Sequence, residues 1–388
     1  MQFSRLMDTF KPSIFSVLDH KRRELEKKGV EVINLSVGTP SLPPPLHVME
    51  AAAKASMDPE SYKYTLADSE ELQDAVISWY KKRYSVDLTA DEMTSVYGSQ
   101  EGLTHFPFVV CNPGDTVIIG TPVYPIFSFG PKFAGASIYA VLTKKENRYL
   151  IDFDEIPDDV AKKAKMIIVS YPSNPLSATA GDDFYERLIA FCKKYDIIAV
   201  HDNAYSEFIH DGTLGKSFLS FKGAKDIGIE FNSLSKSYNL TGLRISFALG
   251  NKEIITAFKT LRSQIDYGIS MIDQKVAIAA LNGPQDIIDL NRAHYKATRD
   301  ALYNGLNEIG WAVPLSGASM FSWLPVPTNQ TAEEFVMDLI DKAGVIVTPG
   351  TAFGKGGEGF VRAALVPDVK TIEKACRRIK DSGILLGR

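Results

Sequence analysis

The sequence contains few cysteines, no long apolar run and no excess of charge of one sign. Its three cysteines, Cys111, Cys192 and Cys376, are widely separated and odd in number, which fits neither a disulfide framework nor a zinc site. No stretch approaches 18 consecutive apolar residues, and the start at Met1 lacks the apolar segment of a secretory signal. We therefore expect a cytoplasmic protein with reduced thiols, no metal site and no membrane segment.

The balance of charge argues against a nucleic-acid-binding protein. The 43 Lys and Arg residues are outnumbered by 47 Asp and Glu residues, which gives a formal net charge of −4. The basic clusters Lys21 to Arg23 and Arg377 to Arg378 are short and have acidic neighbours, as is typical of solvated helix faces. A chain of 388 residues can instead form one large and one smaller domain, each with its own core.

Helical and apolar segments alternate through most of the chain. Residues 17–28 predict a charged amphipathic helix, and the proline-rich run Ser41 to Pro45 predicts a linker. Short apolar strands are expected between helices from residue 46 to 285, at Thr94 to Tyr97, Thr116 to Ile119, Met166 to Ser170, Ile197 to Val200, Asp226 to Phe231 and Arg244 to Leu249. This alternation predicts an α/β fold with a mostly parallel sheet covered by helices.

The pattern changes after Leu281 to Pro284. A long charged helix around Leu290 to Ile309 is followed by short strands and a final helix near Val369 to Ser382, which indicates a smaller α+β domain. We therefore expect an N-terminal segment (1–45) that packs with the small domain, a large cofactor-binding domain (46–285) and a small C-terminal domain (286–388).

Lys236 lies in a run that suits a phosphorylated aldehyde cofactor. Its amine can form a Schiff base, while Ser233, Ser235 and Arg244 can bind a phosphate dianion. A surface lysine in a turn is the simpler reading of the fragment alone, but strands are expected on both sides of it, and open α/β sheets bind ligands at strand ends. Pyridoxal phosphate carries both the aldehyde and the phosphate.

Other predicted strands also end in polar residues. Asp202 follows one strand and could pair with the pyridine nitrogen of this cofactor, while Tyr205 could reach the phenolic oxygen of the ring. Asn174 follows another strand between two prolines and could donate to the same oxygen, although an Asn-Pro pair alone indicates only a turn. Tyr124 could lie flat on the ring or be an ordinary core tyrosine.

Two further segments complete the predicted site. A glycine turn at Gly98 opens a helix whose first residues, Ser99 and Gln100, could bind the phosphate through free amides. Arg362 lies inside an apolar strand, where an unpaired charge is costly, so its partner is either a protein carboxylate or the α-carboxylate of a substrate. We favour the substrate.

The run Gly354 to Gly359 matches the dinucleotide-binding pattern Gly-x-Gly-x-x-Gly, but it precedes a predicted strand instead of following one. We therefore expect a loop here. The hypothesis of a nicotinamide-dependent dehydrogenase loses its main evidence as a result.

Together these segments resemble the class I/II aminotransferases, which are pyridoxal phosphate enzymes of fold type I and include aspartate, alanine and LL-diaminopimelate aminotransferases. The resemblance is carried by Asn34 to Pro40, Tyr62 to Leu72, Gly98 to Leu103, Tyr171 to Pro175, His201 to Tyr205, Ser233 to Arg244, Pro349 to Gly354 and Val361 to Leu365. It implies an enzyme that moves an amino group from an amino acid to a 2-oxo acid through a Schiff base on Lys236.

The resemblance also implies roles for residues outside the lysine run. Arg362, Asn174 and the backbone of Gly38 would hold the substrate α-carboxylate, and Phe15 would be an apolar lid residue. A homodimer with shared sites is expected, in which Tyr64, or Tyr62 if the register differs, reaches the neighbour's phosphate. Ser270 and Met271 would line the neighbour's pocket.

The sequence departs from the usual family pattern at Ser41, Ser177, Leu243 and Ser246, which leaves substrate size and side-chain preference open. A carbon-sulfur lyase or a decarboxylase of the same fold is the alternative activity. A cofactor-sensing regulator would need a DNA-binding module, and only about 30 residues precede the Asn34 motif, too few for one.

Overall fold

A computed structural model describes residues 1–10 and 14–386, except for the side chains of Phe15 and Leu386. The strands are β1 (Ile33–Asn34), β2 (Met93–Val96), β3 (Thr116–Thr121), β4 (Ser137–Leu142), β5 (Ala164–Val169), β6 (Ile198–Asn203), β7 (Gly228–Ser233), β8 (Ser246–Gly250), β9 (Phe321–Pro325), β10 (Val345–Ile346), β11 (Thr348–Pro349) and β12 (Phe360–Ala364).

The α-helices are α1 (Ile14–Lys27), α2 (Leu46–Ser56), α3 (Glu70–Tyr84), α4 (Ser99–His105), α5 (Pro107–Val110), α6 (Ile126–Phe133), α7 (Asp158–Ala161), α8 (Asp182–Tyr195), α9 (Ala224–Ile227), α10 (Leu234–Ser237), α11 (Lys252–Arg262), α12 (Met271–Asn282), α13 (Asp286–Glu308), α14 (Ala332–Ala343) and α15 (Val369–Asp381). Short 3₁₀ turns are η1 (Arg5–Thr9), η2 (Pro59–Tyr62), η3 (Ala90–Glu92), η4 (Lys145–Asn147), η5 (Phe153–Glu155), η6 (Phe218–Ser220), η7 (Gly350–Phe353) and η8 (Ile384–Leu386).

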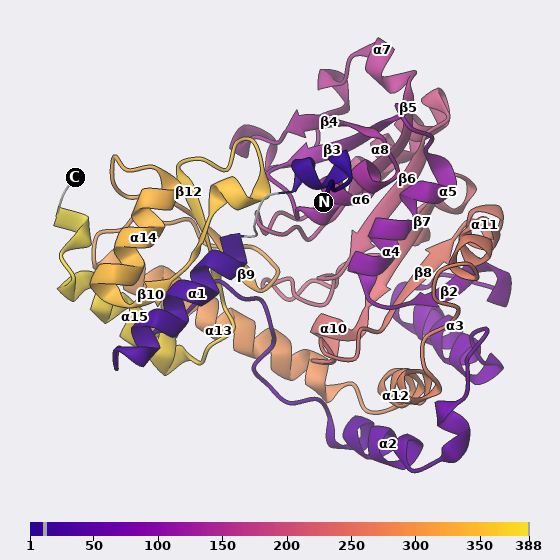
Figure 1. The fold of residues 1–388 in the computed structure, drawn as a ribbon, viewed down its shortest axis with the longest axis horizontal. Helices are drawn as coiled ribbons and strands as arrows, with labels where there is room; N and C mark the ends of the chain where they lie inside the picture. Colours follow the sequence, from indigo (N-terminus) through magenta and orange to yellow (C-terminus); the bar gives the residue numbers. More distant parts are fainter. Residues whose placement is uncertain (11–13, 387–388) are drawn as a thin grey trace.

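The large sheet has seven strands in the order β2-β8-β7-β6-β5-β3-β4 (Figure 1). Strand β8 pairs antiparallel with both β2 and β7, and the other neighbouring strands pair parallel. Non-consecutive neighbours such as β3 and β5 require crossover connections, which here contain helices. The predicted α/β fold with a mostly parallel sheet is confirmed.

Three details of the strand prediction were wrong. The strand expected from Asp226 begins at Gly228, because Asp226 belongs to the short helix α9. The strand expected from Arg244 begins at Ser246, because Arg244 has a φ of 58°, in the left-handed region that a strand excludes. Strand β4 was not predicted, although Ile138 to Leu142 form an apolar run; in the structure it lies at the sheet edge with Val141 as its only buried side chain.

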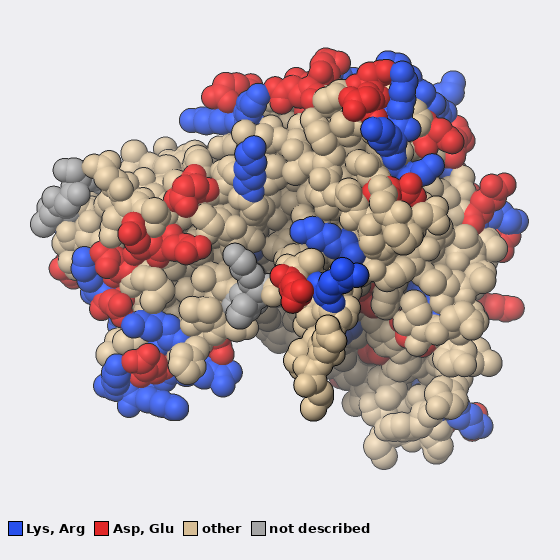
Figure 2. Space-filling view, turned by 45° about the horizontal axis from the view of Figure 1, so that its top comes forward, with Lys and Arg blue, Asp and Glu red and all other residues tan. Residues whose placement is uncertain are grey.

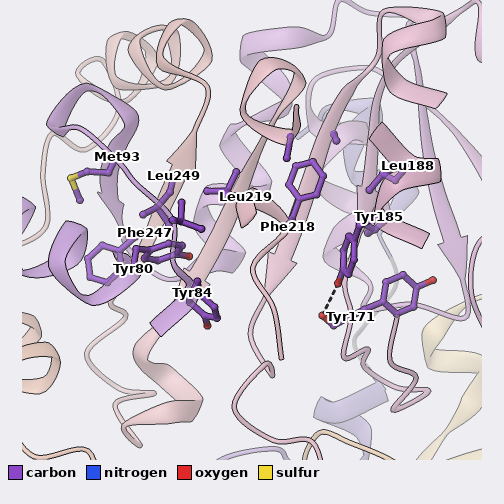
Figure 3. Close-up of a cluster of buried hydrophobic side chains, with 14 of the residues drawn as sticks. Tyr80, Tyr84, Met93, Tyr171, Tyr185, Leu188, Phe218, Leu219, Phe247 and Leu249 are labelled. Atoms are coloured by element: carbon purple, nitrogen blue, oxygen red, sulfur yellow. Dashed lines mark hydrogen bonds between the residues drawn. The ribbon is translucent and has the colours of Figure 1, made fainter. Parts of the chain in front are cut away.

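Each face of the sheet is covered by its own hydrophobic core. Alternate residues of one strand serve the two cores: Ile118 of β3 belongs to one, and Val117 and Ile119 belong to the other. The first core receives side chains from α3, α8 and α12, and Figure 3 shows Tyr80 and Tyr84 of α3 close to Phe247 of β8. The second receives side chains from α4, α6 and α11. The sheet is therefore buried on both faces.

A third core holds the N-terminal segment and the C-terminal part together. Strand β1 pairs parallel with β10, and β11, β12 and β9 form a three-stranded antiparallel sheet. Leu18 of α1 is buried in the same core as residues of β9, α14 and α15. Helix α13 extends from the large sheet toward these smaller sheets (Figure 1). The domain limits at residues 45 and 285 stay a prediction.

Charge is mixed on the surface, as the composition suggests. On the face shown in Figure 2, Lys and Arg side chains are interspersed with Asp and Glu side chains and do not gather into one basic area. Among the described helices, none is both long and apolar enough to cross a bilayer.

Candidate active site

A cavity of about 350 Å³ lies at the edge of the large sheet where the parallel strands end, and residues of the smaller sheets close it from the other side. Of the predicted site residues whose side chains the structure describes, it receives all except Tyr64. Its lining consists of Ser36, Val37, Gly38, Ser99, Gln100, Tyr124, Ser170, Asn174, Asp202, Ala204, Tyr205, Ser233, Ser235, Lys236, Arg244, Phe321 and Arg362.

The topology of the sheet explains why these residues meet. Strands β5, β6 and β7 are parallel, so Asp202 at the end of β6 reaches the same edge as Asn174 and Lys236, which follow β5 and β7. Strand β8 runs the opposite way, and its beginning therefore lies at that same edge. Arg244 precedes β8 and joins the site for this reason.

Lys236 presents its amine to the cavity from the short helix α10. The Nζ atom donates a 2.6 Å hydrogen bond to the carbonyl oxygen of Gly38. Burial, together with the positive charges of Arg362 and Arg244, lowers the pKa of Lys236 to about 8. A larger share of the amine is therefore uncharged, and nucleophilic, at neutral pH than in an ordinary lysine.

Asp202 supplies the buried negative charge of the cavity lining. Its side chain is 6% exposed, and its Oδ1 atom has no hydrogen-bond partner among the described residues. Burial raises the pKa of Asp202 to about 6, against the opposing effects of His201 and Ser99. A buried carboxylate oxygen without a donor suits a ligand that brings a protonated nitrogen, as pyridoxal phosphate does.

An anion cradle lies between Gly98 and Arg244. Gly98 has a φ of 83°, which favours glycine, and a Cβ atom at this position would lie 2.3 Å from Nη2 of Arg244. Gly98 is the N-cap of α4 and provides no side-chain cap for the first amides of that helix. Ser235 also lines the cavity. The cradle fits a phosphate group.

Two of the predicted phosphate and ring ligands already have partners. The hydroxyl of Ser233 caps α10 by accepting from the amide of Ser235 at 3.2 Å. Tyr124 donates from its hydroxyl to Oε1 of Gln100 at 2.8 Å, which ties the two residues together at the cavity wall.

Burial raises the pKa of Tyr205 far above its usual range, so this phenol is protonated at neutral pH.

Arg362 is held in a fixed orientation by several groups. Its guanidinium donates to Oδ1 of Asn174 at 3.0 Å and to the carbonyl oxygen of Ser36 at 2.5 Å. Its Cζ atom lies 4.2 Å from the ring centroid of Phe321 and 4.8 Å from that of Phe353, so aromatic rings cover it. Burial lowers the pKa of Arg362 to about 10. Such a buried guanidinium is a strong site for a ligand carboxylate.

The Asn174 loop is joined to β9 through Ser177, one of the residues that depart from the family pattern. Ser177 has a φ of 55°, and its hydroxyl donates to the carbonyl oxygen of Phe321 at 2.7 Å and lies 2.9 Å from Oγ of Ser319. The ring of Phe321 in turn packs against Gly38, where a Cβ atom would lie 2.5 Å from Cζ of the ring. Ser177 therefore ties the large sheet to the smaller sheets beside the site.

Tyr62, Tyr64 and Ser270 do not line this cavity. Tyr64 is 89% exposed and stacks edge-on with Tyr267 at 6.3 Å, whereas the hydroxyl of Tyr62 donates to the carbonyl oxygen of Ser56 at 2.7 Å. Ser270 caps α12. The side chain of Phe15 lies outside the described part of the chain.

Sequence reasoning missed Ser36, Val37, Ser170, Ala204 and Phe321. All of them except Phe321 lie within four residues of a predicted position along the chain, so including flanking residues would have found them. Phe321 had no local signal, because only the folding of β9 over Gly38 and Arg362 brings it to the cavity. The run Gly354 to Gly359 is a turn ahead of β12, and the prediction that it precedes a strand is confirmed.

Comparison with known proteins agrees with this geometry. Residues 30–379 match the family model for aminotransferase class I and II. The chain is 41% identical to the LL-diaminopimelate aminotransferase of Aquifex aeolicus over 98% of this chain and 99% of that protein. It is 40% identical to the enzyme of the same name from Dehalococcoides mccartyi strain 195, over 98% of each chain.

Solved structures give the same result. The apo form of BacF from Bacillus subtilis superposes with a TM-score of 0.95 and 32% identity, over 100% of this chain and 99% of that one. A probable N-succinyldiaminopimelate aminotransferase from Thermus thermophilus gives a TM-score of 0.89 and 30% identity, over 95% and 100%. The chain therefore belongs to the class I and II aminotransferase family.

This membership establishes the class of reaction. The chain is a pyridoxal phosphate-dependent transaminase of fold type I that moves an amino group from an amino acid to a 2-oxo acid. The predicted cofactor, fold and enzyme class are thereby confirmed, and the lyase, decarboxylase, regulator and dehydrogenase alternatives fall away.

Proposed function

We propose that Lys236 is the residue that bonds the cofactor and moves the proton in amino transfer. The observation that carries this proposal is the convergence of the Lys236 amine, the Asp202 carboxylate and the Arg362 guanidinium on one cavity. When bound, pyridoxal phosphate supplies an aldehyde carbon that condenses with primary amines and a ring that withdraws electrons from the adjacent Cα. The protein then has to hold that ring and the substrate and to move one proton.

The cavity lining divides into groups with separate tasks. Arg244, Ser235 and the α4 amides beside Ser99 hold the phosphate, and Ser233 keeps α10 in place. Asp202 keeps the ring nitrogen protonated, since its buried carboxylate gains a charged partner. Tyr205 and the Nδ2 atom of Asn174 donate to the ring oxygen, and Tyr124, tied to Gln100, covers the ring.

Arg362 and Asn174 orient the substrate by its α-carboxylate, with the backbone of Gly38 closing the other side. With the carboxylate held there, the Lys236 amine would be the group that takes the proton from the substrate Cα and carries it during amino transfer. Because the pKa of Lys236 is lowered to about 8, a larger share of its amine is uncharged at neutral pH than in an ordinary lysine.

We propose LL-diaminopimelate as the amino donor, with a 2-oxo acid as acceptor. The support is the name borne by the relatives at 40% and 41% identity over 98% of the chain. Phe321 and Val37 give the cavity apolar walls, which suit the methylene chain of such a donor. Residues from a second copy would have to contact its distal amino and carboxylate groups.

The experiment is a half-reaction without any 2-oxo acid. Single amino acids, including LL-diaminopimelate, aspartate, alanine and phenylalanine, are added to the cofactor-loaded protein while its near-visible absorption is recorded. Loss of the lysine-bound cofactor band with LL-diaminopimelate, at the lowest concentration of the set, is the expected result. Conversion by another donor alone would refute the substrate but leave Lys236 unaffected, whereas a Lys236→Met variant that still transaminates would refute the lysine assignment.

We also propose a homodimer with shared sites, in the cytoplasm. Exposed apolar side chains support an interface near the η2 segment and the α11–α12 connection; they include Tyr62, Tyr64, Leu66, Ile265 and Tyr267. Tyr64, which is 89% exposed, is our candidate for binding the partner's phosphate, with Tyr62 as the alternative. The free thiols of Cys111, Cys192 and Cys376 suit a reducing compartment. Light scattering should give the dimer mass, and Tyr64→Phe should release the cofactor faster in equilibrium dialysis; a monomer that turns over would refute the shared site.

A further inference from the structure

Asn291 is a buried residue near the start of α13 that contacts the segment carrying Lys236. Its side chain is 1% exposed. The Nδ2 atom donates to the carbonyl oxygen of Ser237 at 3.1 Å and to that of Lys236 at 3.5 Å. An interaction with the backbone of the reactive lysine therefore comes from a residue 55 positions later in the chain.

Asn291 is fixed in turn by a second amide. Asn239 and Asn291 exchange hydrogen bonds between their side chains, at 3.0 Å and 3.2 Å. Asn239 has a φ of 60°, and its Nδ2 atom also donates to the carbonyl oxygen of Pro43 in the proline-rich linker. The amide pair thus joins the segment after Lys236, the start of α13 and the linker from the N-terminal segment.

The carbonyl groups that Asn291 contacts have few alternatives. Helix α10 spans only Leu234–Ser237, and the last carbonyls of any helix have no partner within it. A single helical turn is not stable by itself, because its few hydrogen bonds do not offset the entropy of ordering it. Donors from Asn291 therefore act as a distant cap that fixes the direction in which Lys236 leaves the backbone.

We propose that Asn291 is a positioning residue for Lys236, which it orients by capping α10 from helix α13. The inference rests on the proposed role of Lys236. Displacing a reacting group by about 1 Å can cost on the order of 100-fold in rate. Arg362 and Asn174 hold the substrate from other elements, so the loss should reduce kcat and leave KM nearly unchanged.

The test compares Asn291→Leu with a matched change on the same helix. Thr298 is 0% exposed, and its hydroxyl donates to the carbonyl oxygen of Leu365 at 2.9 Å. Leu365 is far from the lysine segment along the chain. Thr298→Val therefore removes a buried hydrogen bond that does not involve α10. Each cofactor-loaded variant is measured for the pH midpoint of its near-visible absorption without substrate, for kcat and KM, and for Tm.

Asn291→Leu should shift the absorption midpoint by about half a pH unit or more and lower kcat about 10- to 100-fold. Thr298→Val should lower Tm with an unchanged midpoint. Asn291→Gln keeps an amide, so its absorption midpoint should lie between those of Asn291→Leu and the wild type. If Asn291→Leu loses stability like Thr298→Val but keeps the wild-type midpoint and kcat, Asn291 is only structural and the proposal is overturned.

A second variant protects the test against loss of folding. Asn239→Gly keeps the left-handed backbone accessible and removes the amide that holds Asn291, so it should shift the midpoint in the same direction by a smaller amount. An unshifted midpoint in this variant would count against the proposal. Lys236→Met is measured alongside. If this variant keeps the near-visible absorption band of the lysine-bound cofactor, the assignment of Lys236 fails and the Asn291 proposal fails with it. If the band is lost, Lys236 stands, and the Asn291 variants then test the positioning role by themselves.

Discussion

Replacing Lys236 with methionine should stabilise the cofactor-free protein while abolishing turnover. The Lys236 ammonium lies in a largely buried cavity with the like charges of Arg362 and Arg244, and its pKa falls from the ordinary 10.5 to about 8. The folded state therefore disfavours the charged form, whereas the unfolded chain hydrates it fully. Methionine keeps most of the apolar stem and removes the charge.

The size of the effect follows from this pKa. The difference between 10.5 and about 8 corresponds to about 3 kcal/mol of destabilisation, at 1.36 kcal/mol for each tenfold change. Losing the hydrogen bond from Nζ to the carbonyl oxygen of Gly38 offsets about 1 kcal/mol. A gain of about 2 kcal/mol is expected for the variant.

The sign of the pH dependence is fixed by the lowered pKa. The destabilisation by Lys236 is fully present below pH 8. It declines between pH 8 and 10.5, because Lys236 is deprotonated in the folded state there while it still holds its proton in the unfolded chain. The stability gain of the variant should therefore be largest near pH 6.5 and fall by more than about half by pH 9.5.

Denaturant unfolding of the cofactor-free proteins at both pH values measures this difference. Lys145→Met is the matched control, because Lys145 is exposed in η4, and it should change stability little at either pH. A Lys236→Met protein that is less stable than wild type at pH 6.5, or whose gain does not decline toward pH 9.5, would refute the reasoning.

Three further predictions concern the other charged and strained positions. Arg362→Ala should weaken amino-acid binding by about 2 to 5 kcal/mol in a spectroscopic titration, with the cofactor band intact, and unchanged affinity would exclude its role. Asp202→Asn should slow the half-reaction on the order of 100-fold or more, because an amide cannot hold a proton on the ring nitrogen; a wild-type rate in stopped flow would contradict this. Ser177→Gly should be more stable than Ser177→Ala by about 1 kcal/mol in urea unfolding, since only glycine adopts the φ of 55° without cost, and equal stabilities would show no strain.

Local chemistry made much of the site predictable. Lys236, Asp202 and Asn174 each follow a short apolar run, and apolar runs bounded by turn residues indicate buried strands. Parallel strands bring their ends to one edge, so residues distant in the sequence could be assigned to one cavity before any coordinates. Arg362 was found differently, because a lone charge within an apolar strand requires a partner.

Other features depended on contacts between distant segments. Nothing near Phe321 in the chain indicates that its ring covers Arg362, and nothing near Asn291 indicates that its amide reaches the carbonyl oxygen of Lys236. No signal in the sequence indicates that Ser177 has a left-handed backbone or that its hydroxyl bonds to β9. Tyr64 points to solvent in a single chain.

The sequence by itself determined the chemistry of this protein and the alternation of strands and helices along the chain, because short segments carry the signals of strand burial, turns and cofactor-binding groups. The tertiary structure alone decided how that chemistry is held: the reversal of β8 that brings Arg244 to the sheet edge, the aromatic cover of Arg362 and the cap on the lysine helix. These depend on the packing of segments separated by tens to hundreds of residues, which no local pattern encodes.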